Sequence, residues 1–191
     1  MYKKYVKHNL TMHNSSVTHD VRTAEKSVRI KNATAKKKVL FISSTGGHLD
    51  EIMQLKPIFQ SYDYHIVTEK DKSNEVLKKI YRKRISYLIC GTRREFLVYP
   101  FKFAINFFKS LFIYIKIKPK YIITTGTHTA VSMCYIGKLF GSKIIFIETF
   151  ANQETRTLSG RIVYPISNLF IVQWEEMLKL YPKGILGGPI Y

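Results

Sequence analysis

Acidic residues are scarce in this chain. Across its 191 residues, 13 aspartates and glutamates stand against 31 lysines and arginines, which gives a formal net charge of +18. Residues 1–38 hold ten basic and two acidic residues, so that +10 of the charge belongs to the remainder. A field of this sign favours phosphate-bearing partners, namely nucleic acid, anionic lipid headgroups or pyrophosphate-containing substrates.

Cysteine is also scarce, and the sequence lacks the motifs of several enzyme classes. Cys90 and Cys134 each lie in an apolar stretch, which favours reduced, buried thiols in a cytosolic setting over a disulfide framework. No metal-ligand cluster, P-loop or paired-carboxylate hydrolase motif is present, so we expect no metal and no cofactor bound by this chain. The N-terminal residues are polar and basic and do not form the apolar core of a secretory signal, so we expect the chain to face the cytoplasm.

Two regions differ in composition. Residues 1–36 are rich in Lys, Asn, Ser, Thr and His without a sustained apolar period, and they predict a poorly ordered basic tail. The alternative is a polybasic arm that helps to hold the protein on anionic lipid. From residue 37 to 191 the apolar and aromatic content predicts one folded domain.

Strand and helix patterns alternate along this domain. Short apolar runs predict strands at 39–43, 64–69, 85–90, 121–124, 143–148 and 169–173. Helical patterns lie at 48–60, 74–81, 100–117, 129–140 and 174–181. This alternation predicts an α/β fold, a Rossmann-like doubly wound parallel sheet in the order 3-2-1-4-5, with strands one and four adjacent at the ligand-binding edge.

Two strand-to-helix turns share the pattern Thr-Gly-x-His. Turns of this kind present backbone N–H groups and a helix N-terminus to an anion. Because strands one and four are expected to be neighbours, the two turns should lie side by side. The predicted acceptor- or phosphate-binding residues of these turns are Thr45, Gly46, Gly47, Thr125, Gly126, Thr127 and His128.

Four further polar residues are candidates for this edge of the sheet. His48 could bind phosphate, act as a general base, or serve only as a hydrogen-bonded or capping residue. Glu148, at the end of strand five, could support a base or simply cap the strand. Asn152 and Arg156 follow it and could contact phosphate or remain solvated. Glu69 lies where a dinucleotide-binding fold carries a ribose-binding acid, but the turn after strand one lacks the G-x-G-x-x-G spacing.

The segment 96–117 is unusually apolar and aromatic. Its polar residues Lys102, Asn106, Lys109 and Lys116 fall along one narrow helical stripe. Lysines in the middle of the segment argue against a bilayer-spanning helix. The remaining alternatives are core packing, contact with a partner, or a position in the membrane interface with the lysines towards the headgroups. The predicted membrane or partner contacts are Phe101, Lys102, Phe107, Phe108, Lys109 and Phe112. Because the aromatics gather here and do not interleave with the basic residues, we expect no nucleic-acid binding.

Three motifs resemble a known family. They are SSTGGHLDEI (43–52), TTGTH (124–128) and FIETFANQETRTLSGRIVYPISNLFIVQWEE (146–176). The chain from residue 37 onward is similar to the acceptor-side, membrane-recruiting subunits of two-chain N-acetylglucosaminyltransferases of dolichol-linked oligosaccharide synthesis. It is nearer to the bacterial capsule and exopolysaccharide subunits that enhance a partner β-1,4-glycosyltransferase.

The resemblance implies the N-terminal half of a GT-B glycosyltransferase and a role at a lipid-linked acceptor. It implies a polyprenyl-pyrophosphate-linked saccharide acceptor at the cytoplasmic membrane face, and a partner chain that supplies the UDP-sugar site. By this analogy, Gly46, Gly47, His48, Gly126 and Glu148 are acceptor-side positions, with His48 and Glu148 as the expected catalytic pair. The alternative is a non-catalytic membrane scaffold or enhancer, in which case glycosyltransferase activity belongs to the partner.

Overall fold

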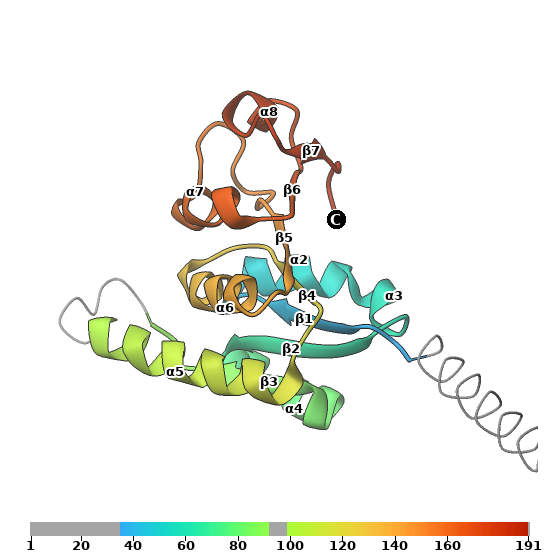
Figure 1. The fold of residues 1–191 in the computed structure, drawn as a ribbon, viewed down its shortest axis with the longest axis vertical. Coiled ribbons are helices and arrows are strands. Elements are labelled where there is room, and N and C mark those ends of the chain that lie inside the picture. Colours follow the sequence, from blue (N-terminus) through green and yellow to red (C-terminus); the bar gives the residue numbers. More distant parts are fainter. Residues whose placement is uncertain (1–34, 92–98, 191) are drawn as a thin grey trace, which may run out of the picture. The chain divides into compact units, whose positions relative to one another are not determined.

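The computed structural model describes residues 35–91 and 99–190, and Figure 1 shows the arrangement of their helices and strands. The predicted basic tail falls almost entirely on residues 1–34, which lie outside the described residues.

Seven parallel strands form one sheet, in the order β3-β2-β1-β4-β5-β6-β7. The strands are β1 (Lys38–Ile42), β2 (Asp63–Glu69), β3 (Ile85–Leu88), β4 (Tyr121–Thr124), β5 (Lys143–Ile147), β6 (Leu169–Val172) and β7 (Ile185–Leu186). Phe41 in the middle of β1 pairs with Ile66 of β2 on one side and with Ile123 of β4 on the other. The predicted doubly wound sheet and the adjacency of the first and fourth strands are therefore confirmed.

Helices cover both faces of the sheet, and this explains why the strands are apolar without alternation. Leu40 and Ile42 belong to a core cluster with Ile113 of α5 (Tyr99–Ile117) and Met133 of α6 (His128–Leu139). The opposite side chains of β1 belong to a second cluster under α2 (Gly47–Gln54) and α3 (Lys56–Phe59), whose members include Val39, Phe41, Ile52 and Phe59. Central strands buried on both sides require apolar residues at every position.

Three further helices and three short 3-10 turns complete the described chain. The helices are α4 (Val76–Tyr81), α7 (Leu158–Val163) and α8 (Met177–Leu180), and the 3-10 turns are Lys72–Asn74, Arg82–Arg84 and Tyr164–Ile166. One prediction needs correction here, and two elements have no predicted counterpart. The predicted helix at 48–60 is two helices that part at Leu55, just before Pro57, which has no N–H to continue the ladder. Helix α7 and strand β7 were not predicted, because six- and two-residue elements show no measurable period.

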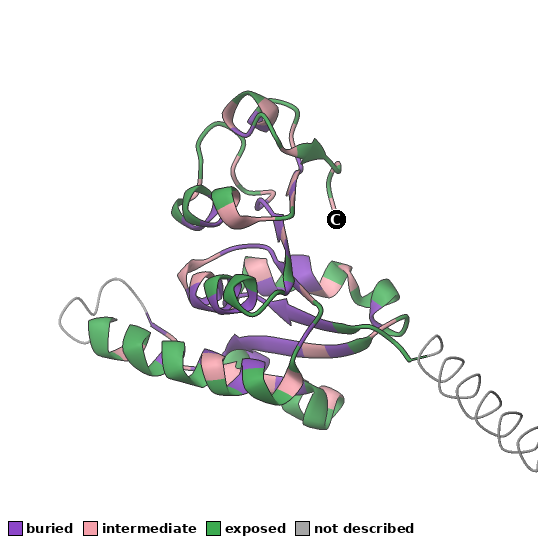
Figure 2. Ribbon diagram, in the orientation of Figure 1, coloured by how far each residue is buried: buried purple, intermediate pink, exposed green. Residues whose placement is uncertain are grey.

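Most of the long helix α5 is exposed, and its buried residues form one narrow stripe from residue 106 onward (Figure 2). Asn106 is 7% exposed, and its side-chain amide donates to the Ile89 carbonyl and accepts from the Ile89 N–H, both at 2.8 Å. Asn106, one residue of the predicted polar stripe, therefore lies against the domain and ties the helix to the segment after β3. Lys109 and Lys116 are exposed at the border of the buried face.

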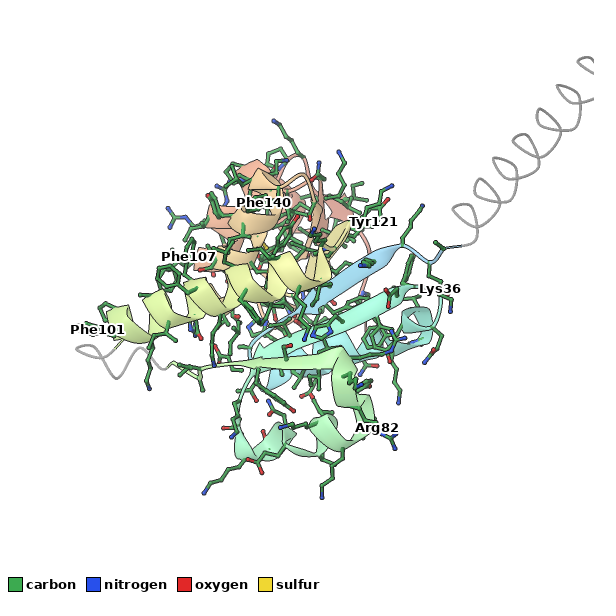
Figure 3. The ribbon with its side chains drawn as sticks, turned by 60° about the horizontal axis from the view of Figure 1, so that its bottom comes forward. Lys36, Arg82, Phe101, Phe107, Tyr121 and Phe140 are labelled. Carbon is green, nitrogen blue, oxygen red and sulfur yellow. The ribbon has the colours of Figure 1, made fainter. Side chains whose placement is uncertain are left out.

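Several phenylalanine side chains of α5 are exposed. The exposed fractions of Phe101, Phe108 and Phe112 are 71%, 68% and 70%, and Phe107 is 39% exposed. Figure 3 shows Phe101 and Phe107 projecting from the ribbon of this helix. Within the described ranges, no helix combines the length and apolarity that crossing a bilayer requires.

His65 on β2 is expected to make the fold acid-sensitive. Burial, with the nearby Lys116 and Arg84, lowers its pKa from 6.5 to about 4, and its Nε2 lies 2.8 Å from Ser86 Oγ. The unfolded chain therefore binds a proton at a higher pH than the folded chain does. Stability should fall as the pH drops from about 6.5 towards 4. Urea titrations across this range should show a shallower loss for His65→Gln, and equal slopes for both proteins would contradict the assignment.

Candidate functional site

The two Thr-Gly-x-His turns meet at the carboxyl edge of the sheet. The Thr125 hydroxyl donates to the His48 carbonyl at 2.8 Å, and the His48 Nδ1 atom lies 2.9 Å from the Thr125 carbonyl oxygen. These reciprocal contacts join residues that are 77 positions apart in the sequence. The adjacency that the sequence predicted for these turns is therefore present as direct hydrogen bonding.

Unusual backbone conformations shape both turns. Gly46 and Gly126 have φ values of 75° and 104°, and Thr127 has a φ of 80°. The positive φ is open to glycine at little cost, but a β-branched threonine adopts it only under strain. Thr127 is held there because its N–H donates to Ser159 Oγ at 3.1 Å, and α6 begins at the next residue. Strain of this kind is commonly maintained at functional sites.

Helix N-termini give this edge a positive character. Helices α2 and α6 begin at Gly47 and His128, directly after the turns. Neither Gly46 nor Thr127, the residue before each helix, caps it with a side-chain hydrogen bond. The N-terminal N–H groups and the helix dipoles therefore favour a negatively charged group close to both turns.

A cavity of about 410 Å³ opens beside the turns. One wall carries the two turn histidines, and a second wall comes from α6 and the start of α7. Phe103 of α5 contributes an aromatic ring to the same cavity. The full lining is His48, Phe103, Thr127, His128, Val131, Thr157, Leu158, Ser159 and Ile162. The lining thus combines polar side chains from the two turns and the start of α7 with apolar side chains from α5, α6 and α7.

The two histidines have different partners. His48 Nδ1 lies near two acceptors, the Thr125 carbonyl at 2.9 Å and Glu51 Oε2 at 3.6 Å. His128 Nε2 lies 3.5 Å from Glu69 Oε1. Glu69 is 3% exposed and also accepts a hydrogen bond from the Thr129 hydroxyl, so it faces the start of α6.

Glu51 is a component of this site that the sequence did not reveal. The carboxyl group is buried, with 1% of the residue exposed, and it bridges α2 to the loop that follows β5. The only sequence signal was its position three residues after His48, which places both side chains on one face of a helix. An acidic residue in a helix is ordinarily read as a solvated side chain, and that is why it was missed.

Glu148 lies at the end of β5 and is 1% exposed. Its Oε1 accepts from the Thr157 hydroxyl at 2.8 Å, and its Oε2 accepts from the Tyr181 hydroxyl at 2.7 Å. Burial raises the pKa of this carboxyl group, and the hydrogen bonds from Tyr181 and Thr157 counteract part of that rise. The geometry makes Glu148 a bridge to α7 and the α8 region, and its catalytic role stays a prediction.

Asn152 and Arg156 are positioned by contacts away from the two turns. The Arg156 guanidinium donates to the Leu180 carbonyl and lies 5.3 Å above the ring of Tyr181. The Asn152 side chain accepts a hydrogen bond from the Thr155 hydroxyl at 3.0 Å. Neither residue lines the cavity beside the turns, so their contact with phosphate also stays a prediction.

A family model described as "Oligosaccharide biosynthesis protein Alg14 like" matches residues 38–190, which include both turns, α5 and the cavity lining. The chain belongs to the Alg14-like family. This match confirms the resemblance to the membrane-recruiting subunits of two-chain glycosyltransferases, and the nearer likeness to bacterial capsule and exopolysaccharide subunits stays a prediction.

Curated Alg14 proteins match most of the chain. The UDP-N-acetylglucosamine transferase subunit ALG14 of Rattus norvegicus is 26% identical over 179 residues, which cover 80% of this chain and 82% of the rat protein. The Candida albicans subunit of the same name is 28% identical over 189 residues, covering 82% and 83%. The named Alg14 proteins are thus subunits of a transferase, and this chain is similar to them over nearly all of the described domain.

Solved structures with the same fold are longer than this Alg14-like chain. MurG from Acinetobacter baumannii matches with a TM-score of 0.59 and 15% identity, over 73% of this chain and 42% of MurG. UDP-GlcNAc 2-epimerase from Methanocaldococcus jannaschii gives a TM-score of 0.58 and 13% identity, over 78% and 45%. The chain spans less than half the length of each structure. These matches confirm a fold equivalent to one half of a GT-B glycosyltransferase.

Proposed function

We propose that this chain is the acceptor-binding, membrane-associating subunit of a two-chain glycosyltransferase in surface polysaccharide biosynthesis. The partner binds the UDP-sugar, and this chain holds a polyprenyl-pyrophosphate-linked saccharide at the cytoplasmic face of the membrane. The observation that carries the proposal is the cavity, whose lining holds the two turn histidines together with apolar side chains that include Phe103 of α5. A lipid pyrophosphate likewise has an anionic part, which polar groups and helix N-termini can bind, and an apolar chain, which apolar side chains can contact.

Two further observations support this assignment. The relatives are named as subunits of a UDP-N-acetylglucosamine transferase, which favours a partner chain and a UDP-sugar donor. The exposed aromatic side chains of α5 and the net charge of +18 suit an anionic membrane surface. The exposed aromatic side chains lie on the same helix that supplies Phe103 to the cavity.

His48 is the residue that we propose as the general base or acceptor-positioning group. A carbonyl oxygen can only accept, so the contact with Thr125 places a proton on Nδ1. In the neutral imidazole, Nε2 is then the nitrogen that can accept a proton from an acceptor hydroxyl. The His48 side chain lines the cavity, which is where such a hydroxyl would be bound.

His48→Ala should lower sugar transfer by about 10²- to 10⁴-fold, which is the usual contribution of a general base. The assay combines the full chain, its co-purified partner, a panel of UDP-sugars beginning with UDP-N-acetylglucosamine, and a polyprenyl-pyrophosphate-linked acceptor. His65→Gln, measured at neutral pH, is the matched control because His65 lies on β2 outside the cavity lining.

The second candidate function is a non-catalytic scaffold that recruits and stabilises the partner. Unchanged transfer by the His48→Ala pair would reject the proposed base and favour this candidate. Full activity of the partner alone, after artificial tethering to the membrane, would establish that recruitment is sufficient. The outward-facing aromatic side of α5 favours this candidate, because it provides membrane contact without using the cavity.

A further inference from the structure

Glu51 carries an ionisable group in the interior of the domain. The residue lies in the second turn of α2 and is 1% exposed. A buried carboxyl group is costly unless its oxygens find donors, so its partners indicate why the fold tolerates it.

One oxygen of Glu51 holds the loop after β5. Oε1 accepts from the Phe150 N–H at 2.6 Å and from the Thr149 hydroxyl at 2.9 Å. The Phe150 carbonyl in turn accepts from the Trp174 indole N–H at 2.7 Å, and the two rings are 4.6 Å apart. These contacts account for Oε1 and fix the orientation of the carboxyl group.

The other oxygen faces the imidazole of His48. Oε2 is buried and has no hydrogen-bond partner among the described residues, and it lies 3.6 Å from His48 Nδ1. The stronger contact of Nδ1 is the Thr125 carbonyl at 2.9 Å. Both neighbours of Nδ1 are therefore acceptors, and two acceptors favour an N–H at that position.

We propose that Glu51 is a positioning residue for His48: its Oε2 completes an all-acceptor environment that holds the imidazole in the tautomer protonated on Nδ1, leaving Nε2 to accept a proton. The consequence for catalysis depends on the proposed function of His48, but the tautomer can be measured without any substrate. Removing an acceptor beside Nδ1 should shift the tautomer. Weakening the hydrogen bonds between Glu51 Oε1 and the loop after β5 should not.

Glu51→Gln is the decisive substitution. The Phe150 N–H is a fixed donor, so the amide oxygen of glutamine must occupy the Oε1 position. The amide NH₂ group then faces His48 Nδ1, where a protonated nitrogen would place two donors against each other. A proton on Nε2 would let Nδ1 accept from the glutamine, whereas the Thr125 carbonyl at 2.9 Å still favours the proton on Nδ1, so the share of the Nε2-protonated tautomer should rise.

The tautomer is read from the ¹⁵N chemical shifts of the imidazole in the full-length labelled protein, with the His48→Ala spectrum assigning the signals. Wild-type protein should show the Nδ1-protonated tautomer, and Glu51→Gln should show a measurably larger share of the Nε2-protonated one. Thr149→Val is the matched control: it removes one donor to Oε1 and leaves Oε2 in place, so His48 should retain the wild-type signals. Unchanged His48 signals in Glu51→Gln would overturn the proposal.

A shorter carboxylate provides a second variant if Glu51→Gln fails to fold. Glu51→Asp keeps only acceptors on this side of Nδ1, so it should preserve the wild-type tautomer. Loss of that tautomer in a folded Glu51→Asp protein would also count against the proposal.

Transfer assays separate this inference from the proposed function. With His48 as the base, Glu51→Gln should lower kcat on the order of 100-fold with little change in KM, and Thr149→Val should retain activity. A tautomer change without any change in kcat would support the positioning role of Glu51 and reject His48 as the base.

Discussion

Gly160→Ala is expected to destabilise the domain by about 3 kcal/mol, a large part of the stability of a typical domain. A Cβ at this position would lie 2.3 Å from Glu148 Oε2, 2.5 Å from the Tyr181 hydroxyl and 2.8 Å from Thr157 Oγ1. The Glu148 carboxyl group accepts from both hydroxyls, through Oε1 from Thr157 and through Oε2 from Tyr181, so the methyl group must displace these contacts. The loss combines the strain of overpacking with hydroxyl groups left without partners.

Urea unfolding of the full-length protein, followed by circular dichroism, measures this effect as a lower midpoint. Gly47→Ala is the matched control, since a Cβ there meets no atom within 4 Å and the backbone needs no positive φ. It should unfold within about 0.5 kcal/mol of the wild type. Equal midpoints for Gly160→Ala and Gly47→Ala would show that the Glu148 bridge does not hold the C-terminal segment.

Replacing Phe101, Phe108 and Phe112 together by serine is expected to lower membrane affinity on the order of 100-fold. The three side chains are about 70% exposed, so their replacement should leave the core intact. Partial insertion of each ring into the acyl boundary contributes about 1 kcal/mol, and the three contributions add to about two orders of magnitude in affinity. Flotation with vesicles of phosphatidylglycerol and phosphatidylcholine measures this loss.

The control replaces exposed apolar residues by serine at the opposite edge of the sheet. Ile185 and Leu186 of β7 are 57% and 46% exposed, and β7 is the last strand on the side away from β3. Ile185→Ser with Leu186→Ser should float as the wild type does. If the triple phenylalanine variant also floats normally, α5 is not the membrane-contacting surface. Equal binding to vesicles without phosphatidylglycerol would remove the role assigned to charge.

The sheet was predictable from the sequence because each strand has its own local signal and the same signal recurs along the chain. Each central strand is a short, continuous apolar run, and the two Thr-Gly-x-His turns punctuate the chain where β1 and β4 end. The right-handed crossover rule then places these strands side by side without any knowledge of side-chain contacts. The meeting of His48 with Thr125 follows from topology in this way.

The polar contacts inside the site could not be predicted, because they depend on burial. Asn106 and Lys109 share one helical stripe in the sequence, but only Asn106 lies against the domain, where it satisfies Ile89. In the sequence, Glu51 looks like an ordinary solvated residue of a helix. Its carboxyl group bridges α2 and the loop after β5 only because that loop folds over it. Glu148 was recognised as a residue of the site edge, whereas its partner Tyr181, 33 positions later, had no sequence signal.

Helix α5 lies between its exposed phenylalanines and the cavity, so its thickness bears on how far the histidine turns would lie from a membrane. The same 19-residue helix presents Phe103 to the cavity and Phe101, Phe108 and Phe112 to the outside, while Asn106 fastens it to the segment after β3. A helix is about 10–12 Å across with its side chains. A bilayer resting on the outer face of α5 would therefore lie about one helix diameter from the histidine turns. That height would suit an acceptor whose pyrophosphate and first sugars stay close to the headgroups, and would limit how far a growing saccharide could reach and still be bound.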